Sequence, residues 1–497
     1  MRSIRYLLSV LLIFWSCVNV FSQDVLFEKN IKLKSGIAKS REVLPVTNGE
    51  NGCVLFLLDH QEISSIVINE QFLMTDSFAI GRAEVPYKNL LGYSKESSNY
   101  HLFFSNKKKN EFFIQTINPV KKQSTSKLFE LKLKKEKMLK AFSYLDNFYV
   151  LTIKKMSSIL ALYQFEGNQM TIRKEFDFSE HKFSYGTYPD MYSAFFDNFN
   201  TLAFKPSAAI IDPNVPISVE TAAESSKIYY FNEAVHLTLD HNSRNTILIS
   251  IHLKSFDHII KYIDKPQLSC GTYSTTLSNS FLSNETIFQI KACKSELAIQ
   301  ATKVETGEQI MHYTVHKDEA IDFKNSPVLV SGGGLFFGGG ETEIDKTKQI
   351  LKHLIRGKLG ISAYRSPDKI TLTLGGYYYL PNSAAGMGMT YNPGFTVSTP
   401  GGPVTVPGSY SHNPTMFGYG NYSNSISTRF NALLNTSTFE HMKGEITKNG
   451  FDKIKEFEDA QPAILYAKTI FKIENRYILG YYDKNKKTYS LLAFEDD

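Results

Sequence analysis

Imidazole and carboxylate side chains gather between residues 236 and 258, and together they are what a metal site or a general acid–base pair requires. In VHLTLDH, however, alternation puts His236 and Asp240 on the strand face opposite Val235 and Leu237. No recognised ligand spacing occurs. We therefore favour solvated polar positions on an outer strand, and we predict no catalytic or metal-binding residue. The residues weighed here are His236, Asp240, His241, His252, Asp257 and His258.

A second pair of histidines, His312 and His316, lies on another expected strand and could be considered as ligands of one metal ion. Residues four apart on a strand share a face but stand about 13 Å from each other. That distance is too long for two side chains to share one ion.

A glycine-rich stretch, SGGGLFFGGGETE at 331–343, holds six of the thirty glycines within ten positions. A phosphate-binding loop needs a lysine after its second glycine, and none follows Gly340. A dinucleotide fingerprint starting at Gly332 would need a glycine where Phe337 stands. The acidic residues that follow already occupy the place where an anion would bind. We expect the glycines to let the backbone bend or approach another segment, and we expect no cofactor.

Lysine dominates residues 101–156, where thirteen lysines stand against four acidic residues. A basic face built from the tract 107–155 suits an anionic surface or an acidic partner. The tract contains lysine but no arginine. Lysine acts as a point charge and does not bind phosphates or bases in the bidentate way that arginine does, so we expect no nucleic-acid ligand. In FELKLKKEK, Leu131 and Leu133 alternate with lysines, which favours a solvated strand edge guarded by lysine.

Most of the chain shows apolar residues with period two, which indicates β-strands. Four apolar runs separated by turn residues fill 138–178, and the same plan recurs at 227–263, 286–315 and 469–494. Three of these units begin alike, at Ile228, Ile287 and Ile470. The sequence therefore predicts repeated antiparallel meanders.

Repeated meanders of about 40 to 50 residues are typical of β-propeller blades, whose sheets bury both faces against their neighbours. We predict an all-β fold, a propeller of roughly six to eight four-stranded blades, forming a single domain over 23–497. The last apolar strand, at 489–494, should seal the ring against the first blade. Two packed β-sandwich or barrel domains are the alternative.

Two segments interrupt the strands. Residues 341–358 place Ile344, Leu351, Leu354 and Ile355 on one helical face, which predicts an amphipathic helix docked on a sheet. Residues 381–424 are rich in Gly, Pro, Ser and Tyr and show no period, which predicts one long loop, either functional or disordered.

The chain begins with Arg2 and Arg5, an apolar run at 6–15 and a small residue at Ser22. This is the pattern of a secretory signal peptide, here over 1–22. An uncleaved anchor and a lipoprotein cysteine at Cys17 are the alternatives that we disfavour. No later stretch is apolar enough to span a membrane as a helix, so we expect no transmembrane segment after cleavage and a secreted or periplasmic protein.

After the signal segment the chain has three cysteines, Cys53, Cys270 and Cys293. So few thiols in so long a chain form no disulfide framework. Cys270 and Cys293 are free to pair, but we favour three buried thiols.

The residues FSQ ahead of DVLFEKN resemble the end of export signals in gram-negative envelope bacteria. The blade pattern broadly resembles that of uncharacterised secreted β-propeller-like proteins of these envelopes, and this resemblance implies no catalytic residue. We therefore expect an exported binding or scaffold protein that presents loops, chiefly 381–424, to a protein or glycan. The alternative is a hydrolase or lyase of envelope polymers with its site at the central funnel, built from His236, Asp240, His241 and His258.

Overall fold

The computed structural model describes most of the chain beyond its N-terminal segment. The described residues are 24–31, 42–47, 52–59, 61–82, 87, 89–106, 109, 111–131, 133, 135–183, 190–196, 208–271, 274–331, 341–378, 396–399, 402–405, 413–423, 427–462 and 465–496. The predicted signal peptide at 1–22 and the glycines at 332–340 lie outside these residues, so those two predictions stay predictions.

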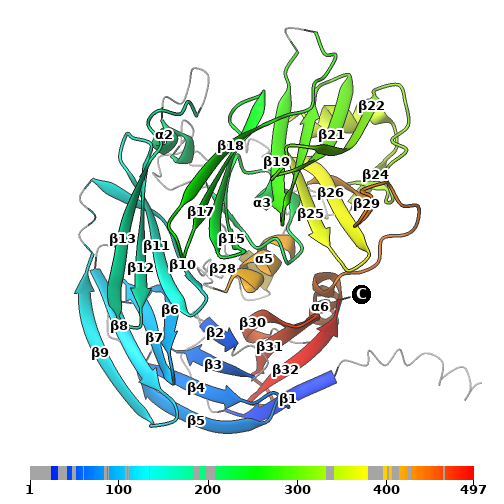
Figure 1. Cartoon of the computed structure of the whole chain (residues 1–497). Helices are drawn as coiled ribbons and strands as arrows, with labels where there is room; N and C mark the ends of the chain where they lie inside the picture. The colour runs from blue at the N-terminus through cyan, green and yellow to red at the C-terminus, as the bar shows by residue number, and fades with distance from the viewer. Residues whose placement is uncertain are drawn as a thin grey trace, which may run out of the picture.

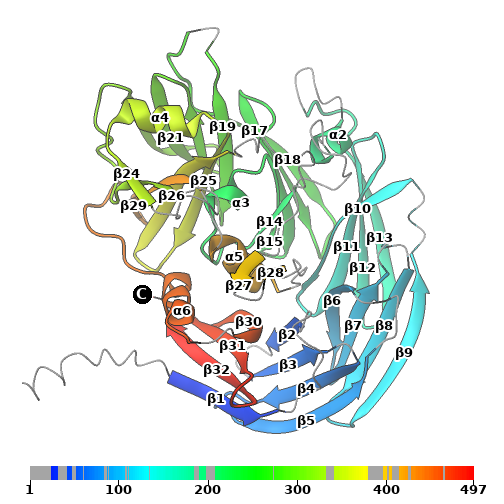
Figure 2. The same cartoon turned by 180° about the vertical axis from the view of Figure 1, so that it is seen from behind.

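Seven sheets of four or five strands stand around a common centre in the described part of the chain, and this arrangement is a β-propeller (Figure 1). The view from behind shows the same ring (Figure 2). The predicted all-β propeller is confirmed, and seven blades fall within the expected range. Blade 1 contains β2 (Glu42–Thr47), β3 (Cys53–Leu58), β4 (Glu62–Ile68) and β5 (Met74–Gly81). Blade 2 contains β6 (Asn89–Glu96), β7 (Asn99–Ser105), β8 (Glu111–Asn118) and β9 (Gln123–Glu130). Blade 3 contains β10 (Glu136–Tyr144), β11 (Asn147–Lys154), β12 (Ile159–Glu166) and β13 (Gln169–Asp177).

Blades 4 and 6 have five strands each, and blade 7 combines the two ends of the described chain. Blade 4 contains β14 (Ala209–Ile211), β15 (Ser226–Phe231), β16 (Ala234–Leu239), β17 (Asn245–His252) and β18 (His258–Asp264), and blade 5 contains β19 (Leu277–Ser283), β20 (Thr286–Ala292), β21 (Glu296–Lys303) and β22 (Gln309–His316). Blade 6 contains β25 (Lys358–Arg365), β26 (Lys369–Tyr377), β29 (Thr428–Asn435), β23 (Val328–Ser331) and β24 (Glu341–Ile344), and blade 7 contains β30 (Tyr466–Ile473), β31 (Arg476–Asp483), β32 (Thr488–Glu495) and β1 (Asp24–Asn30).

Burial follows the position of each strand within its blade. The middle strand β3 and the strand β20 are buried along their whole length, whereas the outer strands β5 and β13 are largely exposed. Because neighbouring sheets cover both faces of a blade, only its outermost strand reaches water. The core therefore lies between blades, as where Leu44 and Phe56 of blade 1 pack with Leu102 and Phe104 of blade 2.

The ring is closed by pairing between the first and last strands of the described chain. β1 runs antiparallel to β32, with Asp24 opposite Ala493 and Asn30 opposite Thr488. The expected strand at 489–494 therefore does seal the ring. It does so by accepting β1 as the fourth strand of the last blade, and not by joining the first blade.

The predicted helix at 341–358 is wrong at its start. Residues 341–344 form β24, which pairs with β23, and the helix α4 begins only at Thr347 and ends at Leu354. The period-two pattern Glu-Thr-Glu-Ile suits a strand, because alternate residues of a strand share a face. Leu351 and Leu354 are buried as expected.

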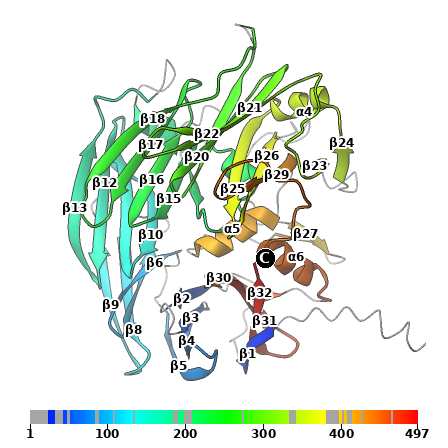
Figure 3. The same ribbon diagram turned by 45° about the vertical axis from the view of Figure 1, so that its right-hand side comes forward.

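The segment 381–424 is not one long loop. Residues 414–423 form the helix α5 (Pro414–Ser423), and β27 (Thr396–Thr399) pairs with β28 (Gly402–Thr405). Both Figure 1 and Figure 3 show α5 inside the ring. Its side chain Tyr419 is 1% exposed, because the helix packs against β30, β14 and the helix α6 (Gly450–Asp459). The remaining described helices are α2 (Met191–Phe195) and α3 (Val219–Ala222).

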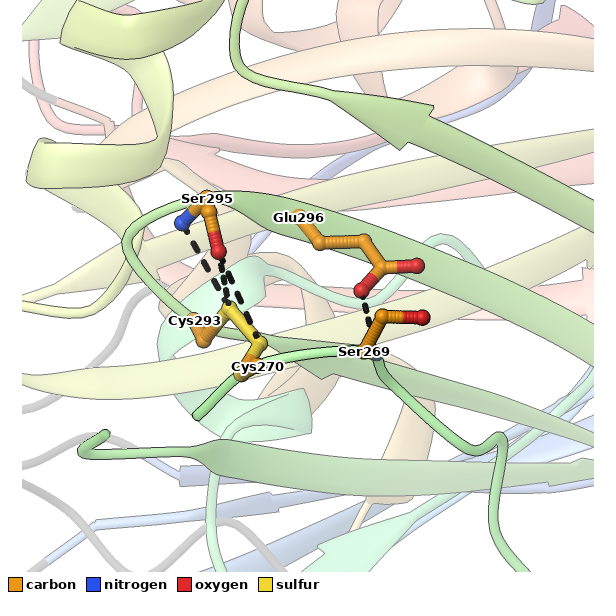
Figure 4. The surroundings of a disulfide bond; sticks show 5 residues. All are labelled: Ser269, Cys270, Cys293, Ser295 and Glu296. Carbon is orange, nitrogen blue, oxygen red and sulfur yellow. Dashed lines mark hydrogen bonds between the residues drawn. A yellow bond between two sulfur atoms is a disulfide. The ribbon is translucent and has the colours of Figure 1, made fainter. Parts of the chain in front are cut away.

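A disulfide joins Cys270 to Cys293 (Figure 4). The favoured interpretation of three thiols was wrong, and Cys53 is the one free, buried cysteine in the described ranges. Cys270 lies in the connection from β18 to β19, and Cys293 follows β20, so the bond ties the link between blades 4 and 5 to blade 5 itself. Beside it, the Ser269 amide donates to Glu296 Oε2 at 2.6 Å.

We expect the double substitution Cys270→Ser, Cys293→Ser to lower the free energy of unfolding by about 3 kcal/mol, because the bond constrains a loop of this size in the unfolded chain. Urea denaturation of oxidised protein measures this difference. Dithiothreitol should lower the stability of the wild type and leave the double variant unchanged. A wild type insensitive to the reductant would contradict the prediction.

Candidate functional site

The four residues proposed for a funnel site have separate interaction partners. His236 Nδ1 lies 2.8 Å from Ser250 Oγ, and its ring packs on Phe231 at 4.5 Å between centroids. Burial is the main cause that lowers the pKa of His236, to about 4, so this imidazole is neutral. These contacts explain a partly buried histidine without any catalytic role.

The other histidines have separate partners. His241 Nε2 lies 3.0 Å from Ser226 Oγ, and His258, exposed on the outer strand β18, packs edge-on against Phe176 and Phe178 of blade 3. His252 is exposed at the end of β17. Asp257, also exposed, lies in the turn that follows, where its carbonyl accepts from the His252 amide. The described residues therefore do not assemble the predicted funnel site.

Asp240 does not face water, contrary to the expectation of a solvated position. Its carboxylate is fully buried between Lys227 and Lys265, whose Nζ atoms each lie 3.1 Å from it. Thr246 Oγ1 and Ser280 Oγ each donate to it at 2.7 Å. Because Ser280 belongs to β19, this buried ion cluster joins blade 4 to blade 5.

The cluster also reaches blade 6. Lys227 Nζ donates to Asn279 Oδ1 at 2.6 Å, and Asn279 Nδ2 donates to the carbonyl of Leu359 in β25. Lys265 Nζ donates to the carbonyls of Asp240 and Asn242. A buried charge is tolerated when it is both paired and hydrogen-bonded, and these three groups meet that condition. The cluster therefore links blades 4, 5 and 6 through buried polar contacts.

A small cavity lies between the inner strands of blades 3 and 4 and α5. Its volume is about 20 Å³, space for about one water, and it is lined by residues of β10, β14, β15 and α5. Lys140 lines it, and burial, followed by the charge of Lys109, lowers the pKa of Lys140 to about 8. Within the described ranges, no three His, Cys, Asp or Glu side chains lie close enough to hold a metal ion.

A larger groove, of about 620 Å³, opens between blades 5 and 6. Small-molecule sites typically measure roughly 300–1,000 Å³. β22 and the chain that follows it form one side, and the segment after β29 forms the other. The lining residues are Tyr313, Thr314, Val315, Glu319, Ala320, Asp322, Phe323 and His441. This groove is the candidate functional site.

Aromatic rings form the rigid part of the groove. The rings of Tyr313 and Phe323 stack with centroids 5.4 Å apart, and the buried Phe323 contacts Phe430 of β29. The Tyr313 hydroxyl accepts a hydrogen bond from the His441 amide at 2.8 Å. Because a phenol donates as well as accepts, Tyr313 is able to donate its proton to a ligand.

Asn325 sets the tautomer of His441. Its Nδ2 donates to the carbonyls of Met442 and Gly444, and its Oδ1 accepts from the Leu433 amide at 2.7 Å. The amide oxygen therefore faces His441, and the Nε2 of that ring, 3.0 Å away, is the donor. His441 Nδ1 is consequently an acceptor.

The lining carries two carboxylates, Glu319 and Asp322, and neither lysine nor arginine. Burial, followed by the charge of Lys443, lowers the pKa of His441, so the imidazole adds no positive charge at neutral pH. Glu319 Oε2 accepts from the His316 amide, whereas Asp322 is exposed and has no hydrogen bond or ion pair to the described residues.

These groups suit a ligand with hydroxyl or amino groups. Carboxylates and the imidazole Nδ1 accept hydrogen bonds, and the hydroxyls of Tyr313 and Thr314 donate or accept. Flat aromatic rings add apolar contact area. The combination of an apolar wall and a few convergent polar groups is typical of binding sites.

Sequence reasoning noticed His312 and His316 but missed the groove between them. Both histidines do lie on one strand, β22, and His312 Nε2 lies 2.9 Å from Thr314 Oγ1. The missed residues Tyr313 and His441 are 128 positions apart. No local pattern connects them, because only the packing of blade 5 against blade 6 brings them together.

No protein-family model and no curated protein sequence matches this chain. Among solved structures, a member of the duf4221 family from Bacteroides vulgatus is 9% identical, with a TM-score of 0.29 over 90% of this chain and 99% of that one. A subtype N10 neuraminidase-like protein of A/little yellow-shouldered bat/Guatemala is also 9% identical, with a TM-score of 0.25 over 71% of this chain and 95% of that one. Likenesses at this level carry no argument about activity.

We expect Asp240→Asn to lower the free energy of unfolding by about 3–5 kcal/mol, because it leaves two buried ammonium groups without a counter-charge. Burial alone raises the pKa of Asp240, but Lys265 and Lys227 outweigh it and the net pKa is lowered. Because the folded-state pKa of Asp240 is lowered, its ionised carboxylate contributes its full stabilisation at pH values above the unfolded-state pKa. That contribution is lost as the pH falls through the folded-state pKa.

Urea denaturation at neutral and acidic pH tests this prediction. The wild type should lose stability in acid more steeply than Asp240→Asn does. Asp318→Asn, an exposed acid, is the matched control and should change stability by less than about 0.5 kcal/mol. A loss below about 1 kcal/mol for Asp240→Asn would show that the cluster is dispensable.

Proposed function

We propose that this chain is an exported binding or scaffold protein that holds a glycan in the groove between blades 5 and 6. The observation that carries the proposal is the groove itself, where a stacked aromatic pair lies beside two carboxylates and a neutral imidazole. Sugars present apolar C–H faces together with hydroxyl groups, and this lining offers contacts for both. A propeller supplies a rigid frame for such a site, because its sheets are packed on both faces.

Two further observations support export. The first residues have the pattern of a signal peptide, and the Cys270–Cys293 disulfide suits an oxidising compartment. Among the described residues, no helix has the length and apolar character that crossing a bilayer requires. Residues 414–423 were expected to be part of a presented loop. They form α5, which packs inside the ring, so we do not propose that they present a ligand-binding loop.

Asp322 provides the sharpest test of the groove. We expect Asp322→Ala to weaken glycan binding about tenfold or more, since hydrogen bonds to a charged group contribute about 1.5–3 kcal/mol. Calorimetric titration with N-acetylated chito-oligosaccharides, their deacetylated forms and neutral gluco-oligosaccharides measures this change. The protein's stability should be unaffected, because Asp322 is exposed and has no partner in the described structure.

Asp318→Ala removes the same charge from an exposed position near the groove that does not line it, and binding should persist. Equal losses in both variants would indicate a general charge effect and contradict the proposed site. A wild type that binds none of the three glycan classes would contradict the proposed function.

A further inference from the structure

Three strand connections of the lysine-rich tract lie at the same end of blades 2 and 3. In an antiparallel meander, alternate connections lie at the same end of the sheet. The connections β7–β8, β9–β10 and β11–β12 therefore share one end of blades 2 and 3. A backbone hydrogen bond from the Lys155 amide to the Lys135 carbonyl, at 2.8 Å, joins two of them directly. We call this end of the two blades the lysine end.

The lysine end carries acidic residues as well, among them Glu111 and Asp177, but two of its exposed lysines have no ion pair with a described carboxylate. Lys135 and Lys155 are exposed, and no described carboxylate pairs with either. Lys154, by contrast, lies 2.8 Å from Glu175 and is thereby neutralised. Four further lysines, 107, 108, 132 and 134, lie outside the described residues.

Met156 stands out at the tip of the β11–β12 turn. It is 83% exposed, more than any other large apolar side chain that the structure describes. Its φ is 53°, in the left-handed region that glycine or asparagine adopts more readily. Such a conformation costs about 1–3 kcal/mol. The position therefore combines backbone strain with exposed apolar surface.

We propose that the lysine end docks on a bilayer containing anionic phospholipid. Lys135 and Lys155 contact lipid phosphates there, and the Met156 side chain enters the head-group region. Each lysine near an anionic leaflet contributes about 1 kcal/mol, and lysine acts as a point charge, which suffices for phosphate. An acidic polysaccharide would satisfy the amines but would leave Met156 in water, so the exposed methionine favours the lipid. The surface lies on blades 2 and 3 and is independent of the groove.

Co-sedimentation of the mature protein with lipid vesicles tests the proposal. The probes are vesicles of phosphatidylcholine alone and of phosphatidylcholine with about three-tenths phosphatidylglycerol. We expect binding to the anionic vesicles only, and weaker binding as salt is added. Lys135→Gln with Lys155→Gln should reduce the partition coefficient about thirtyfold, from about 1 kcal/mol per lysine. Met156→Asn, which adopts the turn conformation more readily, should reduce it severalfold without lowering the stability of the protein.

Lys121→Gln with Lys127→Gln is the matched control. It removes the same charge from exposed positions away from the lysine end, in the β8–β9 turn and on β9, and should bind as the wild type does. Equal losses in both double variants, or binding to neutral vesicles as strong as to anionic ones, would overturn the proposal. Binding to polygalacturonate without binding to vesicles would also overturn it, in favour of an acidic polysaccharide.

Discussion

The pairing of β1 with β32 is the constraint on which the rest of the structure depends. A propeller buries its blades against one another, so an open ring would leave two sheet faces in water. The chain closes the ring by combining Asp24–Asn30 with Thr488–Glu495 in one sheet. Closure places blade 7 against blade 1, where Leu491 lies in one buried apolar cluster with Leu55 and Leu57.

Polar interactions then fix the blades relative to one another. The Lys227–Asp240–Lys265 cluster joins blades 4 and 5 and reaches blade 6 through Asn279. At the other seam, Tyr364 of blade 6 donates to Asp496, which Lys472 of blade 7 also contacts at 3.2 Å. The two surfaces that we propose for ligands, the groove and the lysine end, do not include these buried charges.

The two proposed surfaces use different physics. The groove holds its polar groups in place through Asn325 and the Tyr313–Phe323 stack, so it suits a ligand recognised by geometry. The lysine end relies on net charge and one exposed methionine, which suit a surface and not a single molecule. A protein with both would hold a glycan while resting on a membrane, and each property would be lost separately.

The sequence by itself determined the strands, because apolar periodicity records which side chains face neighbouring sheets. It predicted 138–178 as one blade correctly, yet began the unit at 286 one strand late, since β19 has a polar sequence, LSNSFLS. It misplaced Asp240 in water because alternation cannot reveal that a second blade covers the polar face. Only the tertiary structure decided the Cys270–Cys293 pair, the groove at His441 and the place of α5. Each of these depends on contacts between segments far apart in the chain, which local patterns do not encode.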